Sequence, residues 1–226
     1  MIKITNHSNS MQMKNVLNTF KFIFIIALFG LIFSGCASTK VTSYVNPEMV
    51  NHQCDNVLIE ARTVGLTKQK GIEDAFYEDL SECGFPSIRS YDIFFPGREY
   101  SEAEKKKIYR DNKVDAILTA KICDAGKTKS YQSFTNYYKI GNITTAFSFG
   151  GTSSNPWIEF EAKLYDAQSG EVIWVAGATT KGSGYSSFLN LANSMSNSTV
   201  YQLIKDGRLK DIKLSPPPQK RRGFKY

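Results

Sequence analysis

The residues with the greatest capacity for chemistry in this 226-residue chain are its four cysteines and two histidines. A cysteine thiolate can act as a nucleophile, a metal ligand or a lipid acceptor, and a nearby histidine can serve as its base. His52 stands two residues before Cys54. A tetrahedral metal site needs three or four such ligands, and this pair does not supply them. The sequence therefore predicts no metal site.

The other cysteines lack the neighbours that catalysis requires. Cys83 and Cys123 have only His52 as a potential base after the N-terminal leader, and the chain contains no Gly-x-Ser-x-Gly sequence. The glycine-containing stretches 149–151 and 182–184 are too short to cradle a phosphate. The sequence predicts no catalytic residue and indicates neither a small-molecule substrate nor a cofactor other than covalent lipid.

Cys36 follows a segment with the layout of an export signal. Phe22–Phe33 is an unbroken apolar run of 12 residues, whereas a helix needs about 20 residues to cross a bilayer. Lysines precede the run and two small residues follow it, an order typical of a cleaved secretory signal. We expect a signal peptide over residues 1–35, with translation starting at Met13 or Met11.

The sequence LIFSGC, residues 31–36, resembles the lipobox of bacterial lipoproteins, although Phe33 replaces the usual leucine. The resemblance implies that Cys36 begins the mature protein and carries diacylglyceryl and acyl chains. Several chains on one residue give a permanent anchor, whereas one chain holds only reversibly. Ala37 and Ser38, with no Asp after the cysteine, resemble lipoproteins delivered to the outer membrane. The alternative is an ordinary signal peptide with a coincidental cysteine.

The formal charge of +7 is confined to the two ends of the chain. Residues 37–214 contain 21 basic and 21 acidic side chains, so they carry no electrostatic signature of nucleic-acid binding. Residues 207–226 form a proline-rich tail that either contacts an anionic surface or is solvated. Its four bases are Lys220, Arg221, Arg222 and Lys225.

Strand and helix patterns alternate through the first half of the domain, which we expect over residues 55–206, after a lipidated tether at 36–54. Strands are expected at 56–65, 87–95 and 114–126. Helices are expected at 69–85 and from Ser101 to 113, the second opened by a capping box with Glu104. The acidic residues of the first helix, at 73, 74, 78, 79 and 82, are expected on its solvated face.

The second half predicts a hairpin and a final helix. Residues 157–166 alternate apolar with polar side chains, 167–170 form a turn, and 171–180 return. A helix is expected at 187–204. The fold class is therefore α+β with an α/β-like start, a mixed sheet of about five strands, two to three helices packed on it, and a projecting loop or hairpin.

Cys54 and Cys83 are a candidate disulfide pair. Cys54 precedes the first expected strand and Cys83 ends the helix that returns antiparallel to it, so both lie at one end of this unit. The alternative is that all three cysteines after Cys36 are unbonded apolar side chains.

The sequences VDAILTAKI (114–122) and AKLYDAQSGEVIW (162–174) resemble a group of periplasmic lipoprotein domains. The group includes the amino-terminal domain of TolB, the lipoprotein activators of penicillin-binding proteins and the curli secretion channel. The resemblance covers about residues 55–205. It implies the fold more than a task, since members share no single activity.

Residues 127–156 are an insertion rich in Tyr, Phe, Ser and Thr, and long loops of this kind are usually functional or disordered. They form an extension of the sheet, a docking hairpin, or a hairpin that assembles with other copies. Its candidate partner-binding residues are Tyr131, Phe134, Tyr137, Tyr138, Phe147 and Phe149, because aromatic residues are enriched at interfaces.

Taken together, these patterns predict a non-enzymatic, lipid-anchored interaction module of the cell outer membrane that faces the periplasm. Its partner is expected to be an envelope protein or further copies of itself. One alternative is a subunit of an oligomeric outer-membrane secretion channel, and a second is an envelope enzyme.

Overall fold

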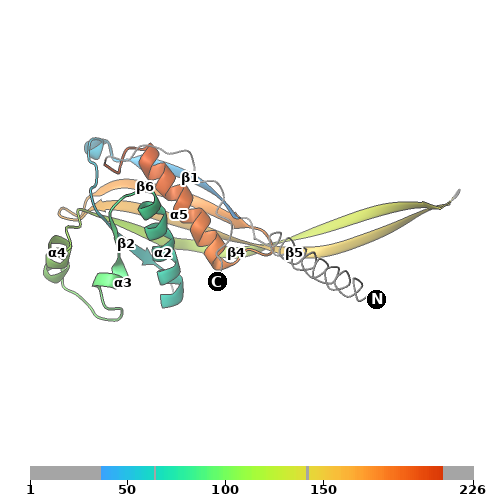
Figure 1. The fold of residues 1–226 in the computed structure, drawn as a ribbon, viewed down its shortest axis with the longest axis horizontal. Helices are drawn as coiled ribbons and strands as arrows, with labels where there is room; N and C mark the ends of the chain where they lie inside the picture. The colour runs from blue at the N-terminus through green and yellow to red at the C-terminus, as the bar shows by residue number, and fades with distance from the viewer. Residues whose placement is uncertain (1–36, 64, 141–142, 211–226) are drawn as a thin grey trace, which may run out of the picture. The chain divides into compact units, whose positions relative to one another are not determined.

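Six strands form one mixed sheet in the order β1-β6-β5-β4-β2-β3, within residues 37–63, 65–140 and 143–210, which the computed structural model describes. Figure 1 shows α2 and α5 side by side on one face of this sheet. The α+β class with a projecting hairpin is confirmed, with six strands instead of about five and four described α-helices. The elements are β1 (Ala37–Val45), η1 (Pro47–Met49), β2 (Val57–Arg62), α2 (Leu66–Glu82), β3 (Ser87–Arg89), α3 (Ser90–Ile93), α4 (Glu102–Asp111), β4 (Ala116–Ile140), β5 (Ile143–Asp166), β6 (Val172–Gly182) and α5 (Phe188–Lys205).

The first strand lies where a tether was expected. All nine residues of β1 pair antiparallel with β6, from Ala37 opposite Gly182 to Val45 opposite Trp174. The inward-facing side of β1 is partly polar, so its residues do not show the apolar–polar alternation typical of a strand. The Thr39 hydroxyl, for example, lies 2.8 Å from that of Thr180. The predicted tether at residues 36–54 is therefore wrong over β1.

The parallel part of the sheet follows the expected strand-helix-strand order. β2 pairs in parallel with both β3 and β4, and α2 returns between β2 and β3. The predicted strand at 87–95 is shorter than expected, because the chain turns into α3 at Ser90. The Ser90 hydroxyl donates a 2.7 Å hydrogen bond to the buried Glu73 carboxylate, which holds this turn against α2.

The main core lies between the sheet and the two long helices. Trp174 of β6 and Phe76 of α2 are both 0% exposed, and burying such side chains supplies most of the stabilising free energy. A smaller cluster on the other face contains Leu58, Val114 and Ala167, with Tyr109 of α4 packed against it. The two clusters fix the sheet between α2 and α5 on one side and the region of α4 on the other.

The Asp206 carboxylate joins β1 and the end of α5 to the core. Asp206, which caps α5, accepts hydrogen bonds from Trp174 Nε1 at 2.8 Å and from Ser43 Oγ at 2.6 Å. Gln202 Nε2 donates a third at 2.9 Å. Since the indole is fully buried, its N–H has no water to replace this acceptor.

Replacement of this carboxylate tests its role. We expect Asp206→Ala to lower the free energy of unfolding by about 2 kcal/mol, because it leaves a buried indole N–H unsatisfied. The matched control is Asp111→Ala, which removes an i,i+4 pair with Lys107 from a side chain that is 60% exposed. That change is expected to cost at most about 0.5 kcal/mol. Urea titration followed by tryptophan fluorescence measures both, and equal losses would contradict this assignment.

Candidate functional site

The candidate site is the hairpin formed by the outer parts of β4 and β5. Their pairing runs from Ala116 opposite Asp166 to Ile140 opposite Ile143, with one irregularity at its base. Beyond Lys127 and its partner Pro156, no other described strand pairs with either of them. At about 3.4 Å per residue this two-stranded part is about 45 Å long, and Figure 1 shows it leaving the sheet. The insertion is thus an outward continuation of two core strands.

The register gives each candidate aromatic residue a position on this hairpin. Phe134 lies directly opposite Phe149, and Tyr137 lies opposite Ala146. Tyr131 is 72% exposed. The side chains of Phe134, Tyr137, Tyr138, Phe147 and Phe149 lie outside the described part of the structure, as do Cys36 and the bases Lys220, Arg221, Arg222 and Lys225.

Two local features set the base of the hairpin. A β-bulge at Cys123 interrupts the register between Ile122 and Asp124, and such bulges bend a strand and increase its twist. Gly126 then lies opposite Trp157. A Cβ atom added to Gly126 would lie 2.8 Å from the Trp157 ring, so the indole packs on the space that a side chain would fill. Glycine is needed here for close approach.

Asp115 in VDAILTAKI and Asp166 in AKLYDAQSGEVIW have structural roles. Asp115 accepts hydrogen bonds from the backbone N–H groups of Asp55 at 2.7 Å and Asn56 at 2.9 Å. Burial acts to raise the pKa of Asp166, but hydrogen bonds from Ser169 and Gln168 outweigh it, so the pKa is lowered. Each carboxylate holds a turn or strand end, which explains why the motifs indicate a fold.

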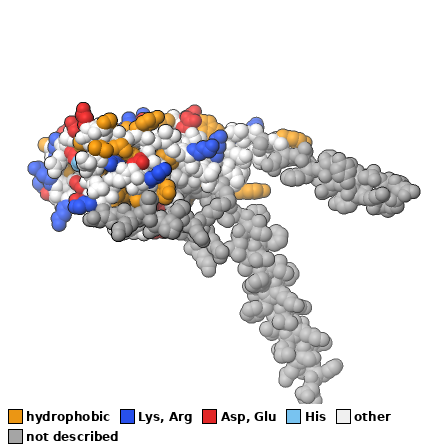
Figure 2. Space-filling model, turned by 90° about the horizontal axis from the view of Figure 1, so that it is seen from above, with side chains coloured by type: hydrophobic (Ala, Val, Ile, Leu, Met, Phe, Trp, Pro, Cys, Tyr) orange, Lys and Arg blue, Asp and Glu red, His pale blue; other side chains and the backbone are white. Residues whose placement is uncertain are grey.

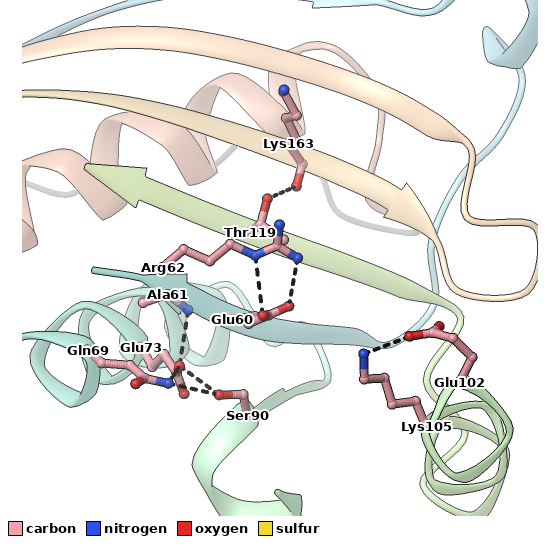
Figure 3. A network of polar contacts seen from close by, with 10 residues as sticks. All are labelled: Glu60, Ala61, Arg62, Gln69, Glu73, Ser90, Glu102, Lys105, Thr119 and Lys163. Atoms are coloured by element: carbon pink, nitrogen blue, oxygen red, sulfur yellow. Dashed lines mark hydrogen bonds and ion pairs between the residues drawn. The ribbon is translucent and has the colours of Figure 1, made fainter. Parts of the chain in front are cut away.

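Two acids of α2 are buried, contrary to the prediction of a solvated face. Glu73 is 0% exposed and accepts hydrogen bonds from the Ala61 N–H at 3.0 Å and from Ser90; Figure 3 shows this cluster. Asp79 accepts a hydrogen bond from Ser196 of α5. These carboxylates join α2 to its neighbours, a use of acids that helical periodicity alone does not reveal.

Neither a metal site nor a membrane-spanning helix occurs in the described parts of the chain. Their His, Cys, Asp and Glu side chains form no group of three or more that could hold a metal ion. None of the described helices combines the length and hydrophobicity needed to cross a membrane. His52 Nε2 lies 3.7 Å from the Asp166 carboxylate, and this pair alone provides too few ligands for a metal.

The predicted disulfide between Cys54 and Cys83 is not formed: both residues, and Cys123, are thiols. Cys54 is 0% exposed and pairs through its backbone with Leu209, while Cys83 lies on the surface at the end of α2. One sulfur is inside the core and the other outside it. Burial, with a further contribution from the Asp115 carboxylate, raises the pKa of Cys54 to about 12.

Thiol alkylation distinguishes the three described cysteines. At pH 8 Cys54 is protonated, well below its pKa of about 12, and a protonated buried thiol does not react with iodoacetamide. We expect Cys83 and Cys123 to be alkylated in the native protein without prior reduction, and Cys54 only in denaturant. Peptide mass spectrometry measures this. If Cys83 reacted only after a reductant was added, the predicted bridge would be reinstated.

The glycine at the hairpin base makes a second test. Gly126→Ala is expected to displace the Trp157 indole, to increase its quenching by acrylamide, and to destabilise the protein by about 1–3 kcal/mol through overpacking. Trp174 is fully buried and adds little to the quenching. The control is Gly177→Ala, since an added Cβ there meets no atom within 4 Å. Unchanged quenching in Gly126→Ala would refute this packing.

Comparison with known proteins gives matches at the level of structure. No known protein-family model matches this chain, and no curated protein matches its sequence. A PelC dodecamer from Paraburkholderia phytofirmans is similar, with 15% identity and a TM-score of 0.44, over 76% of this chain and 99% of that chain. Lipoprotein GNA1162 from Neisseria meningitidis has 16% identity and a TM-score of 0.40, over 66% of this chain and 98% of that chain. Likeness at this level assigns no function to the chain.

Proposed function

We propose that the protein is a lipid-anchored, non-enzymatic interaction module of the cell outer membrane, facing the periplasm. Its hairpin presents aromatic residues to an envelope partner. The observation that carries this proposal is the continuous β4–β5 pairing, which extends from the core of the sheet to Ile140 and Ile143. A long two-stranded extension buries little of its own surface, so function rather than stability accounts for it.

The start of β1 supports a link between anchor and hairpin. A lipid on Cys36 would be attached one residue before Ala37. Ala37 lies opposite Gly182, and the next residue back on β6, Lys181, lies opposite Trp157 at the hairpin base. The anchor and the hairpin would therefore sit at the same end of the sheet, with no linker between lipid and domain.

The chemistry of the described side chains supports a binding role. Glu73, Asp79, Asp115 and Asp166 are all engaged in hydrogen bonds that hold elements of the fold together. Cys54 is buried with a raised pKa, which suits a core residue better than a nucleophile. Tyr and Phe on an extended hairpin match the residue types enriched at protein interfaces.

One observation favours a second candidate function, a subunit of an oligomeric outer-membrane secretion channel. Beyond Lys127 and Pro156, neither strand of the hairpin has a third strand beside it among the described residues. Open strand edges are templates for pairing with another chain. Hairpins of neighbouring copies would then pair with one another, and the partner would be a second copy of this chain.

Crosslinking in cells tests the proposed function. A photo-crosslinking amino acid at Tyr137 or Phe147 is expected to capture an envelope protein, because both positions lie on the outer hairpin. The matched control position is Lys106, an exposed residue of α4, which is expected to give no such adduct. In a Cys36→Ser background we expect the adducts to be lost, since the protein is no longer held at the membrane.

The adduct masses separate the candidates. Adducts at multiples of the chain's own mass would support the oligomeric channel. If neither hairpin position captured anything while a crosslinker in the tail, at Lys220, did so, the hairpin would not be the binding surface. Adducts that persisted at the same level in Cys36→Ser would exclude any need for the lipid.

A further inference from the structure

We propose that the surface around the hairpin base binds an anionic phospholipid bilayer directly, as a non-covalent contact beside the lipid anchor. This hairpin-base surface comprises Leu66, Lys68, Lys127, Lys129, Tyr185 and Leu189. The inference deepens the proposed membrane anchoring and rests on it for its biological setting. Figure 2 shows basic and hydrophobic side chains on the described surface toward the start of the hairpin.

Three large apolar or aromatic side chains of this surface are exposed. Leu66 is 64% exposed, Tyr185 is 79% and Leu189 is 47%. Leu66 and Leu189 belong to the starts of α2 and α5, and Tyr185 belongs to the loop before α5. The two helices approach closely there, since a Cβ added to Gly71 would lie 3.0 Å from Leu189. Leu side chains exposed to water cost free energy, and burial in the interfacial layer of a bilayer removes that cost.

The lysines of this surface make no ion pair within the described part of the chain, and Lys68 Nζ lies 5.8 Å from the centroid of the Phe188 ring. Lys68, Lys127 and Lys129 are exposed, and none forms an ion pair with a described residue. Lys127 and Lys129 point to the same side of β4, because they are two residues apart. Three unneutralised cations beside exposed Leu and Tyr are the composition that favours an anionic lipid surface.

The acidic residues of the same region lie on the other side of the strands. Asp124 and Glu159 are register partners, and Glu159 alternates with the buried Ile158 and Phe160. Glu159 therefore points away from the core side. Ala125, opposite Ile158, points to the core side, and so do Lys127 and Lys129, which follow it at steps of two. Lys127 and Lys129 therefore lie across the strands from Asp124 and Glu159.

The parts of this surface are held together at one end of the sheet. A Cβ added to Gly184 would lie 3.7 Å from side-chain atoms of Ser153 and Asn155, so the loop carrying Tyr185 lies against the hairpin base. Ala37, the residue after the proposed lipid attachment point, pairs with Gly182 at this same end. A lipid on Cys36 would hold this end of β1 at the membrane, beside the basic and apolar side chains, which favours a bilayer over an acidic protein as the occupant.

Vesicle binding of the full chain carrying Cys36→Ser tests this contact without the anchor. The probe is a vesicle of phosphatidylcholine with 30% phosphatidylglycerol, compared with phosphatidylcholine alone. Each lysine near an anionic surface strengthens binding about fivefold, so Lys68→Gln/Lys127→Gln/Lys129→Gln is expected to weaken binding at least about tenfold. The matched control is Lys105→Gln/Lys106→Gln/Lys107→Gln on α4, which removes the same number of charges and keeps the same N-terminal leader. It is expected to change binding less than about twofold.

A second variant keeps the test sharp. Leu189→Ser/Tyr185→Ser retains the lysines and is expected to weaken binding severalfold, with the urea unfolding midpoint used to confirm that each variant is folded. Equal binding by both triple-lysine variants, or equal binding to vesicles without phosphatidylglycerol, would overturn the inference. So would capture of a protein by a crosslinker at Lys129 in cells together with no vesicle binding. None of these results bears on the hairpin adducts at Tyr137 and Phe147, which test the proposed function separately.

Discussion

The backbone pairing of β4 with β5 is the constraint on which the rest of the structure depends. One ladder, with a single bulge at Cys123, begins in the buried core, where Leu118 lies opposite Leu164, and ends at Ile140 opposite Ile143. A slip of one residue would turn every core side chain of either strand to the wrong face. The burial that fixes the register in the sheet therefore also fixes it along the hairpin. The bulge at Cys123 and the Gly126–Trp157 contact then set the direction in which the hairpin leaves.

The acidic side chains in or near the core of this chain hold its elements together. Glu73, Asp79 and Asp206 each join two or more elements, through hydrogen bonds from partners on separate parts of the chain. A buried carboxylate is costly unless its oxygens are satisfied, and here backbone N–H groups, hydroxyls and an indole satisfy them. Polar groups inside this domain therefore specify how its parts fit together.

Residue patterns predicted the fold best where one face of an element is uniformly apolar. The hairpin of β5 and β6 and the helix α2 were located within a few residues, because Ile158, Phe160 and Leu164 or Ile72 and Phe76 mark their buried faces. β1 was missed because its inward positions include Thr39 and Ser43, which meet hydrogen-bond partners instead of apolar side chains. Periodicity detects hydrophobic burial and does not detect polar burial.

The same limit applies to the candidate site and the helix acids. The aromatic residues at 131–149 were identifiable by composition, and a hairpin was among the expected forms of the insertion. The distance that the hairpin extends beyond the sheet could not be predicted from the sequence. Glu73 and Asp79 carry the charge expected of a solvated face, and their partners Ser90 and Ser196 lie 17 and 117 residues away. Contacts at such separations depend on tertiary packing, so local pattern could not predict them.

The place of β1 changes what an anchor at Cys36 would do to the domain. A flexible tether over 36–54 would let the domain turn freely at a distance of about 25 Å from the membrane, by the scaling of flexible chains. Because β1 pairs with β6 along all nine of its residues, no flexible tether would separate a lipid on Cys36 from the sheet. The lipid would then fix orientation as well as location, and the hairpin, continuous with β4 and β5, would keep one direction relative to the bilayer. A rigid element at a fixed angle loses less entropy on meeting its partner than one on a loose tether, which gives a physical reason for the strand to begin so soon after the cysteine.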